Sequence, residues 1–457
     1  MKHRQEKDSL GTVLVPVEAY YGAQTQRAVD NFPISGLRFP RRFIWVLGLL
    51  KKNAAIINRD LGLLEEELAE PIITAAQEVA DGGLDDQFVV DIFQTGSGTS
   101  TNMNANEVIA GRANEILTGE KGFRVPVHPN DHVNLGQSTN DVFPTVIHAA
   151  ASTLIKDRLR PSLAQLHQDL SRKAAEFSDV KKIGRTHLQD AVPISLGQEF
   201  GGYARQIELG IQRVTRAQES LSELALGGTA VGTGLNTHPE FASKTIALLS
   251  RELDCQFRET SNHFEAQATQ DAAVEVSGAL KTLAVSLIKI ANDLRWLASG
   301  PRCGLGEINL PSLQPGSSIM PGKINPVLPE AVIQVAAQVI GHDTVITISG
   351  QAGNFELNTM LPVVAHNLLE SLEILSSVVN IFSRKCVQDI TVNRKQVKWN
   401  LEQSLALATQ LTPAIGYDQA ALIAKQAFES GKTVRETAVE SGILPEEKIE
   451  ELLEDDG

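Results

Sequence analysis

The stretch EAQATQDAAVEVSGALKTLAVSLIKIANDLRWLA, residues 265–298, is the most informative of the long helical patterns in this sequence. From residue 271 onward, at about 100° per residue, its charged side chains fall within roughly half of a helix circumference. These charged residues are Asp271, Glu275, Lys281, Lys289, Asp293 and Arg295. Most of the remainder is Ala, Val, Leu, Ile and Trp, so this helix is expected to be buried on most sides, as in a bundle that is also an oligomer core.

Other long helical patterns surround this segment, and the first hundred residues mix loops with shorter helices. No period-2 series typical of strands is evident, and residues 11–16 are expected to form a loop. The expected helices cover 42–59, 66–81, 141–177, 193–223, 326–349 and 362–385.

These patterns predict an all-α fold with an elongated central bundle of long helices, flanked by smaller N- and C-terminal domains. The bundle is expected to span 138–396, beginning near a helix N-cap at Ser138. The N-terminal domain then covers 1–137 with mixed loops and helices. The more charged residues 397–457 form a small C-terminal helical domain.

The composition limits the kinds of partner that this protein is expected to bind. The chain has 457 residues and a formal net charge of −14, with 42% hydrophobic residues. A net negative charge argues against nucleic acid or an anionic membrane surface as the partner. No apolar segment of about 18 uncharged residues suggests a transmembrane helix. An acidic protein that binds an anionic substrate must therefore concentrate its positive charge locally.

The cysteines and the N-terminus indicate the compartment. Cys255, Cys303 and Cys386 are widely spaced and form no CxxC pair, a pattern typical of reduced thiols. The N-terminal residues lack the apolar region of a secretory signal. We therefore expect a cytoplasmic protein.

The most informative motif is GSSIMPGKINP, residues 316–326. Its two glycines and two prolines exclude a regular helix and predict a loop. A phosphate-binding P-loop is excluded, because five residues separate the glycines and Ile324 follows Lys323. Serines, a lysine and an amide held between rigidifying residues favour an anion site over a plain solvent loop.

Three other polar strings remain ambiguous when judged from the residues alone. Residues 95–102, TGSGTSTN, suit either a carboxylate site or a turn capping the following helix, and they lack the third glycine of a dinucleotide fingerprint. His187 is more often structural than catalytic in such a context, and Asp190 three residues later is weak support for a metal. The turn HPNDH, residues 128–132, has the composition of a capped structural turn.

The 316–326 string matches the Gly-Ser-Ser-x-Met-Pro-x-Lys-x-Asn-Pro signature of the fumarase/aspartase superfamily. The resemblance covers nearly the whole chain, from Glu6-Lys7-Asp8 to Ile415-Gly416-Tyr417-Asp418. It implies a homotetramer with a shared central bundle, in which each active site is built from three subunits. It also implies a small dicarboxylate as the substrate.

The resemblance assigns roles to individual residues. It implies that Ser317 is the general base, and that His187, paired with Glu330, protonates the departing hydroxyl through a water. The implied substrate-binding residues are Ser97, Thr99, Asn102, Ser138, Thr139, Asn140, Thr186, Ser318, Lys323 and Asn325. A second dicarboxylate site is implied at His128, Asn130 and Asp131.

The chemistry explains why such residues are needed. Dehydrating malate removes a weakly acidic C–H proton and leaves an aci-carboxylate carbanion with two negative charges at one end. Donors aimed at that end stabilise the charge as it develops. Lys323 and Asn325, with the hydroxyls of Ser97 and Thr99, suit this task without a metal or organic cofactor.

Within the superfamily, several strings resemble class II fumarases, including NHFEA at 262–266 and GNFELN at 353–358. Thr139 and Asp343-Thr344 resemble aspartases instead, which release ammonia from aspartate. The sequence therefore predicts a fumarate hydratase acting by reversible anti addition of water, with an aspartate ammonia-lyase as the alternative. Lyases of larger substrates lack the flanking strings, and an inactive homologue would usually have lost one of the catalytic residues.

Overall fold

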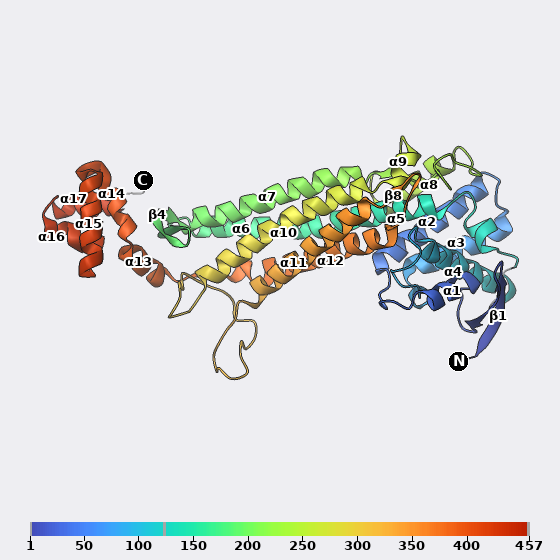
Figure 1. The fold of residues 1–457 in the computed structure, drawn as a ribbon, viewed down its shortest axis with the longest axis horizontal. Helices are drawn as coiled ribbons and strands as arrows, with labels where there is room; N and C mark the ends of the chain where they lie inside the picture. Colours follow the sequence, from blue (N-terminus) through green and yellow to red (C-terminus); the bar gives the residue numbers. More distant parts are fainter. Residues whose placement is uncertain (1, 122–124, 455–457) are drawn as a thin grey trace. The chain divides into compact units, whose positions relative to one another are not determined.

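The computed structural model describes residues 2–121 and 125–454; Met1, 122–124 and 455–457 lie outside the described residues. Its architecture is predominantly helical, as expected (Figure 1). The chain divides into two compact units, each described by itself below. The first contains Met1–Pro161, Gln212–Ala284 and Ala336–Ser376, and the second contains Ser162–Ile211, Val285–Val335 and Ser377–Gly457.

The expected long helices are present. They are α5 (Thr139–Leu154), α6 (Arg160–Glu176), α7 (Leu196–Ser220), α10 (Asp271–Leu297), α11 (Val327–Gly350) and α12 (Leu361–Lys385). The helix expected over 265–298 begins at Asp271, after an extended residue at Thr269 and the short helix α9 (His263–Ala268). The helix expected over 141–177 widens into a π-helical turn at Ile155–Leu159. Pro161 follows that turn and has no N–H for a regular helical bond.

The expectation that strands are absent was wrong at two places. Strand β1 (His3–Asp8) pairs antiparallel with β2 (Gly11–Pro16), where a loop was expected. Strand β3 (Lys181–Thr186) pairs antiparallel with β4 (Gln189–Ser195). Each strand has only six or seven residues, so its alternation is too short to stand out from the neighbouring helical patterns. Shorter bridges join β5 (Glu223–Leu224) to β6 (Arg258–Glu259), β7 (Ile308–Asn309) to β10 (Thr391–Val392), and β8 (Gly353–Asn354) to β9 (Leu357–Asn358).

The first unit contains the N-terminal helices α1 (Ala23–Asn31), α2 (Arg41–Asp60), α3 (Glu66–Asp81), α4 (Thr99–Thr118) and α8 (Phe241–Leu253). Phe39, Phe43 and Phe143 form an aromatic cluster with ring centroids 4.4 to 5.7 Å apart. Phe143 also lies where a side chain on Gly98 would have to go. The cluster therefore fixes α5 beside the start of α4, where hydroxyl-rich residues gather.

Glu107 on α4 joins that helix to α1. Its carboxylate is buried and accepts hydrogen bonds from the backbone N–H groups of Gly22, Gln24 and Thr25 at 2.9 to 3.0 Å. These N–H groups lie at the start of α1, whose N-cap residue provides no side-chain acceptor. The carboxylate therefore takes the place of a helix cap.

In the long-helix segments of the first unit, the buried carboxylate of Asp343 pairs with the partly exposed Lys281. Lys281 Nζ lies 2.6 Å from Asp343 Oδ2, and the hydroxyl of Ser277 donates to the other oxygen at 2.9 Å. Around them, α10 buries Ala273, Val276 and Leu280, among others. The pair restricts how α10 and α11 can pack, because a shift would leave a buried charge without its partner.

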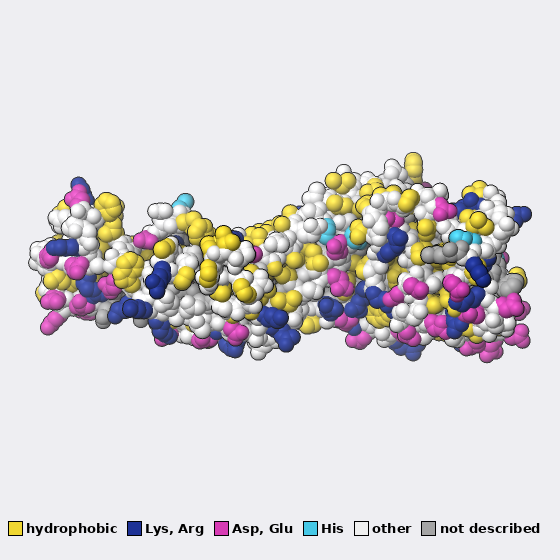
Figure 2. All heavy atoms as spheres, turned by 90° about the horizontal axis from the view of Figure 1, so that it is seen from below, with side chains coloured by type: hydrophobic (Ala, Val, Ile, Leu, Met, Phe, Trp, Pro, Cys, Tyr) yellow, Lys and Arg dark blue, Asp and Glu magenta, His cyan; other side chains and the backbone are white. Residues whose placement is uncertain are grey.

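Helix α11 is long and apolar enough to cross a membrane by length and composition alone, and about a third of its most hydrophobic window is buried. Ile348 on this helix is 60% exposed. Figure 2 shows hydrophobic side chains gathered in the middle of the view, with few charged side chains among them. Exposed apolar side chains on a long apolar helix such as α11 are typical of a protein interface.

The C-terminal helices of the second unit have a hydrophobic core of their own. These helices are α13 (Arg394–Gln403), α14 (Ala408–Ile415), α15 (Tyr417–Ser430), α16 (Val434–Ser441) and α17 (Glu446–Glu454). Leu411, Ile423, Val434 and Ile449 are among its buried members. The proposed domain boundaries at 137 and 396 stay predictions.

Replacing Glu107 by Ala tests the cap that it provides. The variant should lower the free energy of unfolding by about 2–4 kcal/mol, because three buried N–H groups lose their acceptor. Hydrogen exchange followed by mass spectrometry should show faster exchange at residues 22–31. The control is Glu66→Ala, which removes an exposed carboxylate from the first turn of α3. Wild-type exchange rates in Glu107→Ala would contradict this role.

Candidate active site

The loop at 316–326 is closed at its base by two hydrogen bonds in the second unit. The N–H of Gly316 donates to the carbonyl of Lys323 at 2.7 Å, and Asn325 Nδ2 donates to the carbonyl of Gly316 at 2.8 Å. A side chain at 316 would place its Cβ 2.6 Å from that Lys323 oxygen. Glycine is therefore required at 316 for the loop ends to approach this closely.

A tight turn shapes the far part of the loop. The N–H of Lys323 donates to the carbonyl of Met320 at 3.3 Å, across Pro321 and Gly322. Gly322 has φ of +79°. Proline at the second position and a left-handed glycine at the third are the residues that a type II turn requires.

Ser317 is held inside this framework with its oxygen facing backbone donors. Its Oγ accepts hydrogen bonds from the N–H groups of Ile319 at 3.2 Å and Met320 at 3.0 Å. Hydrogen bonds donated to an oxygen favour its negatively charged form. A serine hydroxyl is a weak base unless nearby N–H groups stabilise its alkoxide, and the loop provides two such groups.

A cavity of about 630 Å³ lies beside the loop. Lys323, Asn325 and Glu330 line it, together with Arg295 and Asn309. Arg295 was not expected in the site, because its position on a helix carries no sequence signal for a ligand. It gives the cavity a second cation besides Lys323, which suits an anion.

His187 lies at the tip of the β3–β4 hairpin in the second unit. Thr186 pairs with Gln189, so His187 and Leu188 form a two-residue loop with φ of 57° and 59°. Two positive φ values define the type I′ turn, which usually contains Asn and Gly. A His-Leu pair here stores backbone strain, and such strain is often found at functional sites. His187 and Thr186 are both exposed in the single chain.

Ion pairs with the buried carboxylate of Glu307 hold strand β3 of this hairpin in place. Lys182 and Glu307 are almost fully buried, with Lys182 Nζ 3.5 Å from Glu307 Oε2. Arg185 Nη2 lies 2.6 Å from Glu307 Oε1. Burial opposes ionisation of Glu307, but Arg185 and Lys182 outweigh it and hold the pKa of the carboxyl below its usual value. The hairpin base is therefore fixed while its tip remains accessible.

In the first unit, the hydroxyl-rich string lies at the start of α4. Gly98 is the N-cap residue with φ of +83°. The hydroxyls of Ser97 and Thr99 lie 2.7 Å apart. A side chain at Gly96 would collide with the carbonyl of Thr359. The string starts a helix, as one reading predicts, and it gathers hydroxyls at a helix N-terminus, where an anion is favoured. The carboxylate site itself stays a prediction.

The second polar string starts α5. Ser138 and Asp141 form a capping box, in which Ser138 N–H donates to Asp141 Oδ1 at 2.9 Å. Asn140 Nδ2 donates to the carbonyl of Ala230 at 2.8 Å. Asn102 Nδ2 on α4 donates to Thr139 Oγ1 at 3.0 Å. This bond brings the N-termini of α4 and α5 together, so the predicted contacts from both strings share one place within the unit.

The turn at 128–132 has a fixed histidine. His128 Nδ1 accepts from the N–H groups of Asn130 at 3.3 Å and Asp131 at 3.2 Å. Asp131 Oδ2 lies 3.2 Å from the same nitrogen. The reading as a capped structural turn therefore holds, because the His128 ring caps its own turn. Asn130 and Asp131 are exposed beside it.

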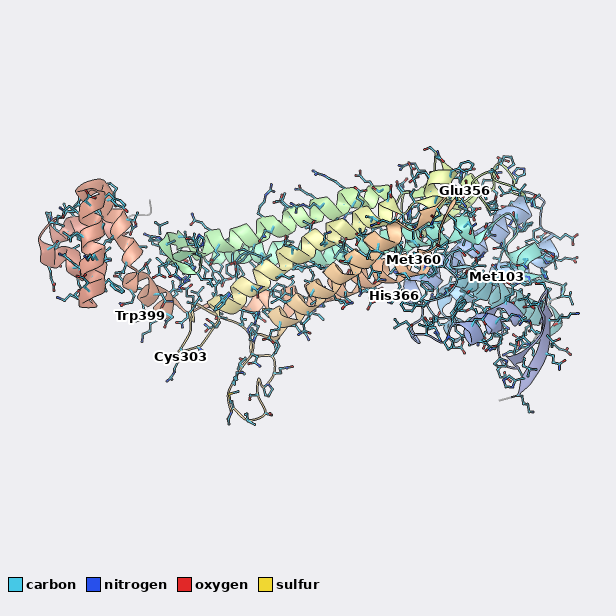
Figure 3. All side chains as sticks on the ribbon, viewed as in Figure 1. Met103, Cys303, Glu356, Met360, His366 and Trp399 are labelled. Atoms are coloured by element: carbon cyan, nitrogen blue, oxygen red, sulfur yellow. The ribbon has the colours of Figure 1, made fainter. Side chains whose placement is uncertain are left out.

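Some predicted partners do not meet within the described chain. Neither Ser317 nor His187 lines the cavity that contains Lys323 and Glu330. Among the hydrogen bonds and ion pairs of the described residues, none joins His187 to Glu330. No group of three His, Cys, Asp or Glu side chains in the described part is placed to hold a metal ion. The three cysteines are free, and Cys303, labelled in Figure 3, is exposed on the segment between α10 and β7.

Two supporting residues escaped the sequence analysis. Lys51 on α2 and Asn134, which follows the 128–132 turn, bond to each other at 2.9 Å beside Asn102. Neither lies in a recognisable motif, because their role depends on contacts between distant segments. Met103 (labelled in Figure 3) follows Asn102 on α4, and its sulfur lies 3.5 Å from Asn106 Nδ2.

Comparisons with known proteins show the family of this chain. Residues 11–341 match the protein family described as Lyase, and residues 407–455 match the family described as Fumarase C C-terminus. The chain is 56% identical to the class II fumarate hydratase of Halobacterium salinarum, covering 100% of this chain and 97% of that protein. It is 54% identical to the Nitrosomonas europaea class II fumarate hydratase, with coverage of 98% and 97%.

Solved structures give the same result. The fold is similar to a class II fumarase from Schistosoma mansoni, with a TM-score of 0.95 and 40% identity, over 99% of this chain and 98% of that one. It is also similar to a fumarate lyase:delta crystallin from Brucella melitensis bound to cobalt, with a TM-score of 0.93 and 45% identity, over 99% and 98% of the two chains.

Replacing Gly316 by Ala tests the closed base of the loop. The new Cβ must displace the Lys323 carbonyl and move Ser317 with it. We expect kcat/KM to fall on the order of 100-fold, as for other displacements of about 1 Å, while the thermal unfolding midpoint changes little. The control is Gln314→Ala, an exposed residue just before the loop. Equal activity in the two variants would show that the loop base does not position Ser317.

Proposed function

This chain belongs to the lyase family that includes the class II fumarases, and from that premise we propose how its site acts as a fumarate hydratase. The enzyme is a hydro-lyase that interconverts fumarate and (S)-malate. Family membership over nearly the full length supports this activity, with class II fumarate hydratases at 52 to 56% identity. The finer roles below are proposals for this chain's own residues.

The observation that carries the proposed mechanism is the pair of N–H groups on Ser317 Oγ. A serine hydroxyl is a weak base, but two fixed donors lower the energy of its alkoxide. In this proposal the alkoxide takes a C3 proton from malate. Electrons from the broken C–H bond enter the adjacent carboxylate, giving an aci-carboxylate with two negative charges.

The donors around the site stabilise that charge. Lys323 and Asn325 supply a cation and an amide from the loop, and Ser97 and Thr99 supply hydroxyls at a helix N-terminus. Thr186, Ser318, Ser138, Thr139 and Asn140 complete the proposed substrate contacts. His187, held by Glu330, protonates the departing hydroxyl through a water molecule. The elimination is anti, since base and acid act on opposite faces.

We propose that a homotetramer completes the site. His187 and Glu330 make no contact in one chain, and the strained, exposed hairpin tip is available to another subunit. The apolar exposed face of α11 suits burial against other copies. Active sites shared by three subunits would then bring His187, Ser317 and the α4–α5 residues together.

Three further proposals concern a second binding site, the cellular location and the metabolic role. His128, Asn130 and Asp131 form a second dicarboxylate site, supported by the exposure of Asn130 and Asp131 on a turn that the His128 ring holds in place. Free thiols at Cys255, Cys303 and Cys386 support a cytoplasmic location. There the reaction would serve the tricarboxylic acid cycle.

Absorbance near 240 nm (roughly where the conjugated diacid absorbs) tests the reaction directly. Purified protein should consume fumarate and form malate in a buffer without ammonium or phosphate. Conversion to aspartate that depends on ammonium would contradict the hydratase and favour the ammonia-lyase.

Replacing Ser317 by Ala tests the base. The variant should lose on the order of 100-fold or more in kcat with a much smaller change in KM, because the hydroxyl acts mainly in the transition state. The thermal unfolding midpoint and oligomeric state should match the wild type. A kcat near the wild-type value would rule out Ser317 as the base.

Mixed tetramers test whether subunits share the site. Ser317→Ala and His187→Asn should each be nearly inactive; asparagine tolerates the left-handed backbone at 187. Co-expressed with different affinity tags and purified as mixed tetramers, the two variants should regain activity, because some sites then contain both intact residues. Mixed tetramers as inactive as their parents would show that both residues act from one subunit.

A further inference from the structure

A chain of hydrogen bonds beneath the first unit's polar cluster runs from a buried lysine to a proposed substrate contact. Lys51 is fully buried on α2, and its Nζ donates to Asn134 Oδ1 and Gln137 Oε1, each at 2.9 Å. Asn134 Oδ1 also accepts from Asn102 Nδ2 at 3.2 Å. Asn102 Nδ2 in turn donates to Thr139 Oγ1 at 3.0 Å.

Each link in this chain has a fixed direction. Asn134 Nδ2 donates to the backbone carbonyl of Gln137 at 3.1 Å, so its oxygen must face Lys51 and Asn102. Gln137 Nε2 donates to two backbone carbonyls, which fixes its oxygen toward Lys51 in the same way. Burial lowers the pKa of Lys51 to about 7. Even the neutral amine has two N–H groups, enough for these two oxygens.

The orientation of the Asn102 side-chain amide matters, because the flipped orientation would be favourable if Asn134 were absent. Asn102 Oδ1 is buried without a hydrogen-bond partner in the described chain. If the amide flipped, this oxygen could accept the hydroxyl proton of Thr139, and an unsatisfied buried acceptor would gain a partner. The flipped oxygen would also face Asn134 Oδ1, and two acceptors repel. Asn134 therefore keeps Asn102 in the orientation that donates to Thr139.

We propose that Lys51 and Asn134 are positioning residues that force the hydroxyl of Thr139 to donate toward the bound dicarboxylate. Since Thr139 Oγ1 accepts from Asn102, its own proton is left for another acceptor, and no acceptor for it lies in the described part of the chain. A substrate carboxylate is such an acceptor. The inference rests on the proposed function, in which Thr139 contacts the substrate.

The test compares Asn134→Leu with Asn134→Asp in the full-length protein. Leucine removes the acceptor and releases Asn102 to flip, so KM for fumarate should rise about tenfold, as for loss of one hydrogen bond to a charged group. Aspartate keeps an acceptor facing Lys51 and Asn102 but loses the donor to the Gln137 carbonyl, so its KM should lie between those of the wild type and Asn134→Leu. In both variants kcat should change less than KM does in Asn134→Leu.

A double variant separates positioning from general loss of structure. Thr139→Val removes the hydroxyl itself, and adding Asn134→Leu to it should raise KM no further. Independent effects that multiply would overturn the proposal. If Asn134→Leu does not fold, Asn134→Ala, which removes the same acceptor, takes its place in the same comparison. Lys52→Met is the control, because Lys52 bonds Gln77 and Glu252 instead and should leave KM unchanged.

Calorimetry with succinate, a dicarboxylate that cannot be hydrated, tests the positioning role separately from the hydratase activity. The dissociation constants should follow the same order as the KM values across the variants. Wild-type protein that binds succinate but does not hydrate fumarate would contradict the hydratase while leaving the positioning role supported by the binding data. Wild-type protein that binds no succinate, or equal binding by wild type and Asn134→Leu, would overturn the positioning role.

Discussion

A dianionic carboxylate on the reaction intermediate requires hydrogen-bond donors that are oriented before the substrate arrives. Donors that had to reorient during the reaction would cost much of the stabilisation they provide. Much of the local structure described above serves this constraint. The closed loop base fixes two N–H groups on Ser317, and the buried polar chain from Lys51 fixes the amide of Asn102.

The constraint also explains how an acidic protein can bind an acidic substrate. The net charge is −14, while the donors proposed for the substrate are mostly neutral N–H and O–H groups, at helix N-termini in the first unit and in the loop of the second. Such dipoles act over short distances and need no overall positive charge. Lys323 and Arg295, both lining the loop cavity, add positive charge only where the dicarboxylate would lie.

The sequence predicted the long helices and the loop well, because both depend on local signals. The apolar periodicity of 271–297 and the Pro-Gly pair at 321–322 act over a few residues. The two hairpins were missed, since six-residue strands carry little pattern and the type I′ turn at His187 and Leu188 contains neither Asn nor Gly. Lys51, Asn134 and Arg295 were also missed, because their contacts with distant segments of their own unit depend on the tertiary fold.

A crystal structure of the assembled protein with fumarate bound would show whether pre-oriented donors from several subunits surround the substrate carboxylate. One carboxylate of fumarate should lie within hydrogen-bond distance of the Thr139 hydroxyl and Asn325, with Ser317 Oγ near the substrate carbon. His187 and Ser317 should reach that fumarate from different subunits. Fumarate bound away from the signature loop, or a site completed by a single chain, would contradict the account.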